Sequence, residues 1–256
     1  MVKEMSVLAN RSLELLPMTR HRSKTPAVLV VAGTVVAIAL FALAWRRAIA
    51  PRRERHRARH RADEHAGSSV TEAPADHGVD RQGEESGVGD LTHRRYSIEV
   101  PRSTFTRQSL IREIQQRVHE LSPSALAEFE KTSGHTSYMV VGDEYDVTML
   151  GPWNGRVRVA KVADDSFTLI TLDGHPEAGH ITFTVEDHVN QPDAFVVSIE
   201  SWARSRDKTV QVAYDTMSVG RQVQAEVWVT FLQRVAELTG CADVPKVDID
   251  SEDLTT

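Results

Sequence analysis

Residues that could do chemistry are concentrated in one short segment, where His175, Glu177 and His180 follow the pattern His-x-Glu-x-x-His. Imidazole titrates near neutrality, so such residues could share acid–base work or bind a metal. Zinc deaminases pair His-x-Glu with a later Cys-x-x-Cys, which the single cysteine, Cys241, excludes. His-Glu-x-x-His zinc sites need a helix, whereas a flanking Gly and Pro predict a loop here. We expect no metal and no cofactor, and His175 and Glu177 are weak catalytic candidates that could equally contact a ligand or form a structured turn.

Large aromatic side chains form the second group of candidates. A buried tryptophan is most often part of a core, but in a domain with an internal pocket the core residues also line the pocket. The candidate ligand-binding residues are therefore Trp153, His175, Glu177, Trp202, Trp228 and Phe231.

The elements that must position these residues can be read from hydrophobic spacing. Residues 96–100 alternate as a strand ended by Pro101, and apolar residues at helical spacing predict a helix over 106–121. Ser122-Pro123-Ser124 predicts the start of a second helix, through about Lys131.

From there the apolar period becomes two, which predicts strands around 145–149, 157–159, 167–172, 181–185 and 195–199, separated by turn residues. A stripe of close to 3.6 period predicts a long helix over 208–238. This order predicts an α+β fold, an antiparallel sheet with helices on one face.

The segments Gly151-Pro152-Trp153-Asn154-Gly155 and 171–179 (TLDGHPEAG) carry a family resemblance. They resemble an uncharacterised UPF-type (domain of unknown function) family of START-like, Bet v 1-like helix-grip domains, over about residues 93–240. That family often has Pro at the position of Asp173 and an acidic residue at that of His180. The resemblance implies a curved sheet wrapped around a long C-terminal helix, with a cavity that in START-like domains commonly binds lipids or other apolar molecules. Some START-like domains are cyclases or hydrolases.

A run of about twenty residues without a charge, Pro26 to Trp45, predicts one membrane-spanning helix. Eight arginines follow within sixteen residues, so the positive-inside rule predicts a cytoplasmic C-terminal side and an N-terminus outside. We expect a single-pass protein of the cell membrane. The alternative is a cleaved signal peptide, because Ala42-Leu43-Ala44 resembles a cleavage site.

The arginine cluster is either a topology signal alone or a clamp on anionic lipid headgroups. The residues in question are Arg46, Arg47, Arg52, Arg53 and Arg55. The expected organisation is a stub (1–25), the span (26–45), a basic then acidic disordered linker (46–91), a START-like domain (92–242) and an acidic tail (243–256).

Charge excludes one class of partner. Residues 92–256 carry 16 Lys and Arg against 25 Asp and Glu, so nucleic-acid binding has no electrostatic basis. We expect a membrane-tethered domain that binds an apolar or amphipathic small molecule such as a lipid. The alternatives are a cyclase or hydrolase that uses His175 and Glu177, and a non-catalytic interaction module at the membrane.

Overall fold

The computed structural model describes residues 57–60, 78–150, 154–208, 210 and 219–254. The chain divides into two compact units, Met1–Pro51 and Arg52–Thr256, and every described residue belongs to the second. The predicted span, Pro26 to Trp45, lies outside the described residues. Within the described ranges, no helix combines the length and apolar character that crossing a membrane requires.

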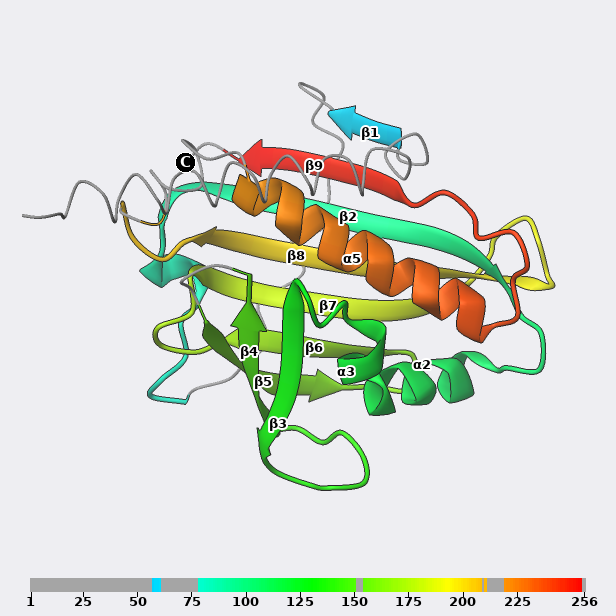
Figure 1. Ribbon diagram of the computed structural model, residues 1–256, viewed down its shortest axis with the longest axis horizontal. Coiled ribbons are helices and arrows are strands. Elements are labelled where there is room, and N and C mark those ends of the chain that lie inside the picture. Colours follow the sequence, from blue (N-terminus) through cyan, green and yellow to red (C-terminus); the bar gives the residue numbers. More distant parts are fainter. Residues whose placement is uncertain (1–56, 61–77, 151–153, 209, 211–218, 255–256) are drawn as a thin grey trace, which may run out of the picture. The chain divides into compact units, whose positions relative to one another are not determined.

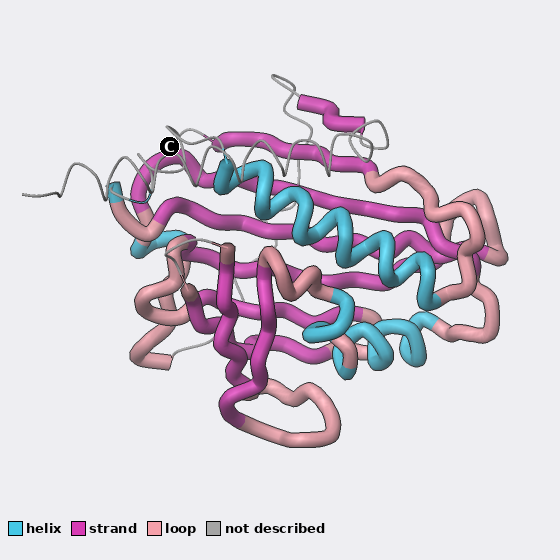
Figure 2. Tube along the Cα trace, viewed as in Figure 1, coloured by secondary structure: helices cyan, strands magenta, loops and turns pink. Residues whose placement is uncertain are grey.

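The described unit is built on one sheet with helices against one face (Figures 1 and 2). In chain order the elements are β1 (Arg57–His60), η1 (Glu84–Ser86), β2 (Val88–Pro101), α2 (Arg107–Gln116), α3 (Val118–Leu121), β3 (Ala127–Ser133), β4 (Glu144–Met149), β5 (Gly155–Val162), β6 (Ser166–Thr171), β7 (Glu177–Asp187), β8 (Ala194–Ser205), α5 (Val219–Leu238) and β9 (Asp248–Leu254). The strands lie in the order β1-β9-β2-β8-β7-β6-β5-β4-β3, and all neighbours are antiparallel except β1 and β9.

The strand register assigns each side chain to one of two sheet faces. Tyr96, Ile199 and Phe183 lie side by side on β2, β8 and β7. Phe183 packs against α5, so this row marks the inner face of the sheet. Because side chains alternate along a strand, residues an odd number of positions away point to the outer face.

Aromatic packing joins α5 to the inner face. The ring centroid of Phe183 lies 5.7 Å from that of Trp228 and 5.4 Å from that of Phe231. The same ring stacks on Phe167, with a centroid distance of 4.5 Å. Figure 1 shows α5 lying across this face. The arrangement confirms the predicted antiparallel sheet with a C-terminal helix on one face.

The predicted helix over 106–121 is confirmed as α2 and the short α3. Thr106 begins α2 with a capping box, in which its hydroxyl accepts from the Ser109 backbone N–H. Leu110, Ile111 and Ile114 are its buried face.

The second predicted helix, from Ser122 to about Lys131, is wrong. Pro123 O accepts hydrogen bonds from the N–H groups of Leu126 and Ala127, which makes a turn, and β3 begins at Ala127. From Ala127 the chain alternates buried and exposed residues, and Phe129 pairs with Val147 of β4. This period of two is that of a half-buried strand.

Both ends of the domain extend beyond the expected boundaries. Residues 78–91, placed by the sequence in the linker, pack against the sheet and include η1 and the start of β2. Residues 248–254, expected in an acidic tail, form β9, which pairs along β2 from Leu91 to Ser97. Both segments are polar, and backbone pairing rather than apolar burial gives them their structure.

Candidate functional site

A chain of polar side chains lies between the sheet and α5. Glu177, the first residue of β7, points to the inner face, where both of its carboxylate oxygens accept from Gln224 Nε2, at 3.1 and 2.9 Å. Gln224, on α5, in turn accepts a hydrogen bond from the Arg94 guanidinium through its own Oε1. The side-chain amide of Gln224 on α5 thus links a carboxylate on β7 to a cation on β2.

Burial and neighbouring charges shift the pKa values of the ionisable groups of Glu177 and Tyr96. Burial raises the pKa of the Glu177 carboxyl, against the lowering effects of the Arg94 charge and the Gln224 hydrogen bond. Tyr96 is next to Arg94 on the same face, and burial raises its pKa to about 12. The Arg94 charge lowers the pKa of Tyr96 and the Glu177 charge raises it, so the phenol lies within the field of both.

Beside this polar chain, the side chains packed between the sheet and α5 are apolar and aromatic. Gln224, Trp228 and Phe231 are spaced i, i+4 and i+7 on α5, so they share one helix face. The indole of Trp228 is buried, and its Nε1 has no hydrogen-bond partner within the described part of the chain. A buried N–H normally finds an acceptor, so this group is available to a bound molecule or to water.

His175 serves the turn that leads into β7. Its Nδ1 lies 3.0 Å from both the backbone N and the backbone O of Glu177, so either neutral tautomer finds a partner. The ring packs on Gly155, where an added Cβ would lie 2.1 Å from His175 Cδ2. Burial lowers the pKa of His175 to about 4, so the ring is neutral at pH 7.

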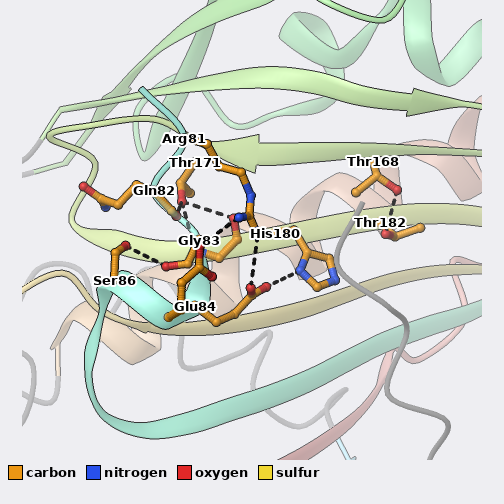
Figure 3. A network of polar contacts seen from close by, with 11 residues as sticks. Arg81, Gln82, Gly83, Glu84, Ser86, Thr168, Thr171, His180 and Thr182 are labelled. Atoms are coloured by element: carbon orange, nitrogen blue, oxygen red, sulfur yellow. Dashed lines mark hydrogen bonds and ion pairs between the residues drawn. The ribbon is translucent and has the colours of Figure 1, made fainter. Parts of the chain in front are cut away.

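The backbone of the same turn is also held by Gln82. Its Nε2 donates to the carbonyl oxygens of His175 (2.8 Å) and Glu177 (2.7 Å), and its Oε1 accepts from Gly174 N–H at 3.1 Å. Gln82 belongs to residues 78–87, which we call the strap. Figure 3 shows Gln82 beside Thr171, and Glu84 of the strap reaching His180.

Trp202 and His180 lie on the opposite face of the sheet. They are cross-strand partners three residues from Ile199 and Phe183, which places both on the outer face. Trp202 stacks on His93 at 3.8 Å, and His180 Nδ1 pairs with Glu84 of the strap.

The predicted ligand-binding residues are therefore only partly brought together. Glu177, Trp228 and Phe231 share the layer under α5, and His175 adjoins it through the turn. Trp202 is separated from them by the sheet, and Trp153 lies outside the described residues. No group of side chains that could hold a metal ion occurs among the residues described.

Sequence reasoning missed Arg94, Tyr96, Gln224 and Gln82. Arg94 and Tyr96 carried a signal, because they alternate with outward residues on a strand that was predicted only from residue 96. Gln224 shares a helical face with Trp228, which could also have been read from spacing. Gln82 gave no signal, since it lies in a stretch with linker composition.

Residues 89–236 match the family model described as Domain of unknown function (DUF1990). The chain belongs to this family. The match confirms the resemblance carried by the 151–155 and 171–179 segments, and the polar chain and its turn lie inside this DUF1990 domain. None of the curated proteins compared with the chain matches it.

Several solved structures overlap with the DUF1990 domain at low similarity. Norcoclaurine synthase from Thalictrum flavum, in complex with dopamine and hydroxybenzaldehyde, has 13% identity and a TM-score of 0.42, over 72% of this chain and 98% of its own. The di-domain ARO/CYC StfQ from the steffimycin biosynthetic pathway has 13% identity and a TM-score of 0.40, over 61% and 51%. A conserved protein from Geobacillus kaustophilus has 12% identity and a TM-score of 0.39, over 58% and 95%. At these levels the overlaps say nothing about what the DUF1990 domain binds.

Proposed function

We propose that this chain is a membrane-tethered protein whose DUF1990 domain binds an apolar or amphipathic small molecule, such as a lipid, between the sheet and α5. One observation carries the proposal. The polar chain Arg94–Gln224–Glu177 borders an aromatic layer in which the buried Trp228 Nε1 lacks a partner among the described residues. An apolar surface with a few convergent polar groups is what a binding site for an amphipathic molecule requires.

The roles within such a site follow from chemistry. Trp228 and Phe231 would contact the apolar part of the ligand, and the Trp228 N–H would donate to it. The Glu177 carboxylate accepts only from Gln224 among the described residues, and a carboxylate has room for further donors. Arg94 would attract negative charge. The polar end of the ligand therefore lies at Glu177 and Arg94.

The alternative of a catalytic His175–Glu177 pair is not supported by this geometry. The His175 ring serves the Glu177 backbone and packs on Gly155, while the Glu177 carboxylate bonds to Gln224. The two side chains have different partners, and the imidazole is held neutral by burial.

The membrane part of the proposal rests on sequence. Pro26–Trp45 would span the bilayer, and Arg46, Arg47, Arg52, Arg53 and Arg55 would hold the cytoplasmic side, at about 1 kcal/mol per residue for contact with anionic lipid. The single cysteine, Cys241, offers a direct test of sidedness. In intact cells a membrane-impermeant maleimide should leave Cys241 unlabelled until the membrane is opened. Labelling of Cys241 in intact cells would show that the C-terminal domain lies outside the cell. A mature N-terminus beginning after Ala44 would show that the segment is a cleaved signal peptide instead.

Ligand binding is tested by native mass spectrometry of the full chain in mild detergent, with myristic acid and 1-myristoyl-lysophosphatidylcholine as probes. We expect a one-to-one adduct with at least one probe, lost in Trp228→Ala. Trp202→Phe is the control, because Trp202 lies on the outer face and its replacement should leave the adduct. Absence of adducts with both probes, together with no co-purified molecule, would end the binding proposal.

A further inference from the structure

The strap lies in the gap where β6 and β7 diverge. Gln82 N–H donates to Thr171 O at 2.9 Å, and Gln82 O accepts from Gly179 N–H at 3.0 Å. Asp173 N–H donates to Asp80 O at 2.8 Å. The strap therefore pairs with the last residues of β6 and with β7, and it closes the sheet at the turn that carries Glu177.

Charged side chains fix the strap on either side of Gln82. Asp80 accepts from Arg158 of β5 at 2.8 and 2.9 Å, and this contact lowers the pKa of Asp80. Glu84 pairs with His180 of β7, whose side chain is only 4% exposed. Gln82 itself is 5% exposed, so its amide is an interior group held between two anchors.

All three hydrogen bonds of the Gln82 amide go to the backbone of the turn 174–177. Together with His175, Gln82 holds both polar backbone atoms of Glu177, since Nδ1 of His175 can accept from the N–H and Gln82 donates to the carbonyl. A residue fixed at both backbone atoms has a fixed Cα–Cβ direction. In Glu177 this direction leads to Gln224 on α5.

We infer that Gln82 is a positioning residue, through which the strap sets the place of the Glu177 carboxylate at the polar end of the ligand site. The inference rests on the proposed ligand-binding function. It gives residues 78–87 a second role, because the same ten residues that join the N-terminal part of the chain to the domain also hold the site. Displacing the strap would move Glu177 away from Gln224 and change what the site accepts.

The test uses the full chain in mild detergent and two variants of Gln82. Gln82→Glu is isosteric and places an oxygen against the carbonyls of His175 and Glu177, whereas Gln82→Met keeps the length and removes all three hydrogen bonds. Glu85→Gln is the matched control, because Glu85 lies on the same strap, is 64% exposed and pairs only with Arg81 among the described residues. Carboxyl 13C NMR of Glu177 reports its pKa, and hydrogen exchange reports the Gly174 and Gly179 amides.

In both Gln82 variants we expect faster exchange at Gly174 and Gly179 and at least tenfold weaker binding of 1-myristoyl-lysophosphatidylcholine. In Gln82→Met, which adds no charge, we also expect the pKa of Glu177 to move toward its ordinary value. Glu85→Gln should match the wild type in all three. If Gln82→Glu does not fold, Gln82→Met alone decides the result. An unchanged pKa of Glu177 in folded Gln82→Met would overturn the inference, whatever the probe does. A shifted pKa in a protein that never binds the probe would support the positioning role and remove the proposed function.

Discussion

The carboxylate of Glu177 and the side-chain amide of Gln224 meet at 2.9 Å across the space between β7 and α5. The carboxylate is at the first position of its strand, and the amide shares a helix face with Trp228 and Phe231. Strand, helix and aromatic layer are thus tied together by one hydrogen-bonded pair, whose charge depends on pH.

Replacing Glu177 by Gln should stabilise the protein at neutral pH, by about 1 kcal/mol. The pKa of Glu177 is raised above 4.5 by burial, so the folded state binds a proton more readily than the unfolded state. Ionisation therefore destabilises the fold as pH rises through the unfolded and then the folded pKa. The gain should be present at pH 7 and disappear below about pH 4, as measured by urea unfolding at both pH values. A variant less stable than wild type at pH 7 would show that the ionised carboxylate stabilises the fold.

His175 should make the fold sensitive to mild acid. Its folded pKa of about 4 lies below the ordinary 6.5, so its contribution is complete above pH 6.5 and is lost progressively as pH falls toward 4. When His175 is fully protonated, the free energy of unfolding is lower by about 3 kcal/mol, and part of this loss has already occurred at pH 5. His175→Gln should flatten the dependence of the unfolding free energy on pH between 7 and 5, above the range where carboxylates with ordinary pKa values titrate. His119→Gln is the control, because the His119 side chain is 59% exposed. Equal slopes in His175→Gln and wild type would contradict the prediction.

A methyl group at residue 155 should disturb the His175 turn. The Cβ of alanine would lie 2.1 Å from His175 Cδ2, so Gly155→Ala should cost about 1 to 3 kcal/mol as an overpacking change. In a His175→Ala background the methyl has space, and the cost should largely vanish. A double-mutant cycle by urea unfolding measures this coupling. Additive effects of the two changes would mean that the ring can move aside without cost.

Trp228 separates packing from hydrogen bonding. Trp228→Ala removes a ring packed against Phe183 and Phe231 and should cost about 3 to 5 kcal/mol. Trp228→Phe keeps a ring and removes a buried N–H that has no partner within the described residues, so it should cost clearly less. Thermal and urea unfolding of the two variants provide the comparison. A cost for Trp228→Phe close to that of Trp228→Ala would show that the indole N–H has a partner.

Much of this fold could be predicted because alternation is a local property. Six strands and two helical regions follow from apolar spacing between residues 96 and 238. For Ala127–Ser133 the sequence predicts a helix, because a Ser-Pro-Ser start signal precedes it and the short Ala-Glu-Phe-Glu-Lys run fits either period. The strand is decided by the pairing of Phe129 with Val147 across the sheet. Residues 78–87 and β9 could not be predicted, because their structure comes from backbone pairing with segments distant in sequence.

The candidate site, too, can be predicted from the sequence only in part. Glu177, Trp228 and Phe231 were selected for residue type and lie in one layer. Trp202 was selected for the same reason, yet it faces outward, because three residues beyond Ile199 the strand presents its other side. Arg94 and Gln224 are 130 residues apart in sequence, and only the packing of α5 on β2 brings their side chains together.

The strand β9 also bears on how copies of this protein behave toward one another. It occupies the edge of β2, a strand of fourteen residues whose open N–H and C=O groups would otherwise offer a template for strand addition. Its own sequence, DIDSEDL, contains four acidic residues, and its other edge is paired in parallel with β1, so β9 lies inside the sheet rather than at its end. A chain truncated before residue 243 would lack β9, and we expect it to self-associate through the exposed edge of β2.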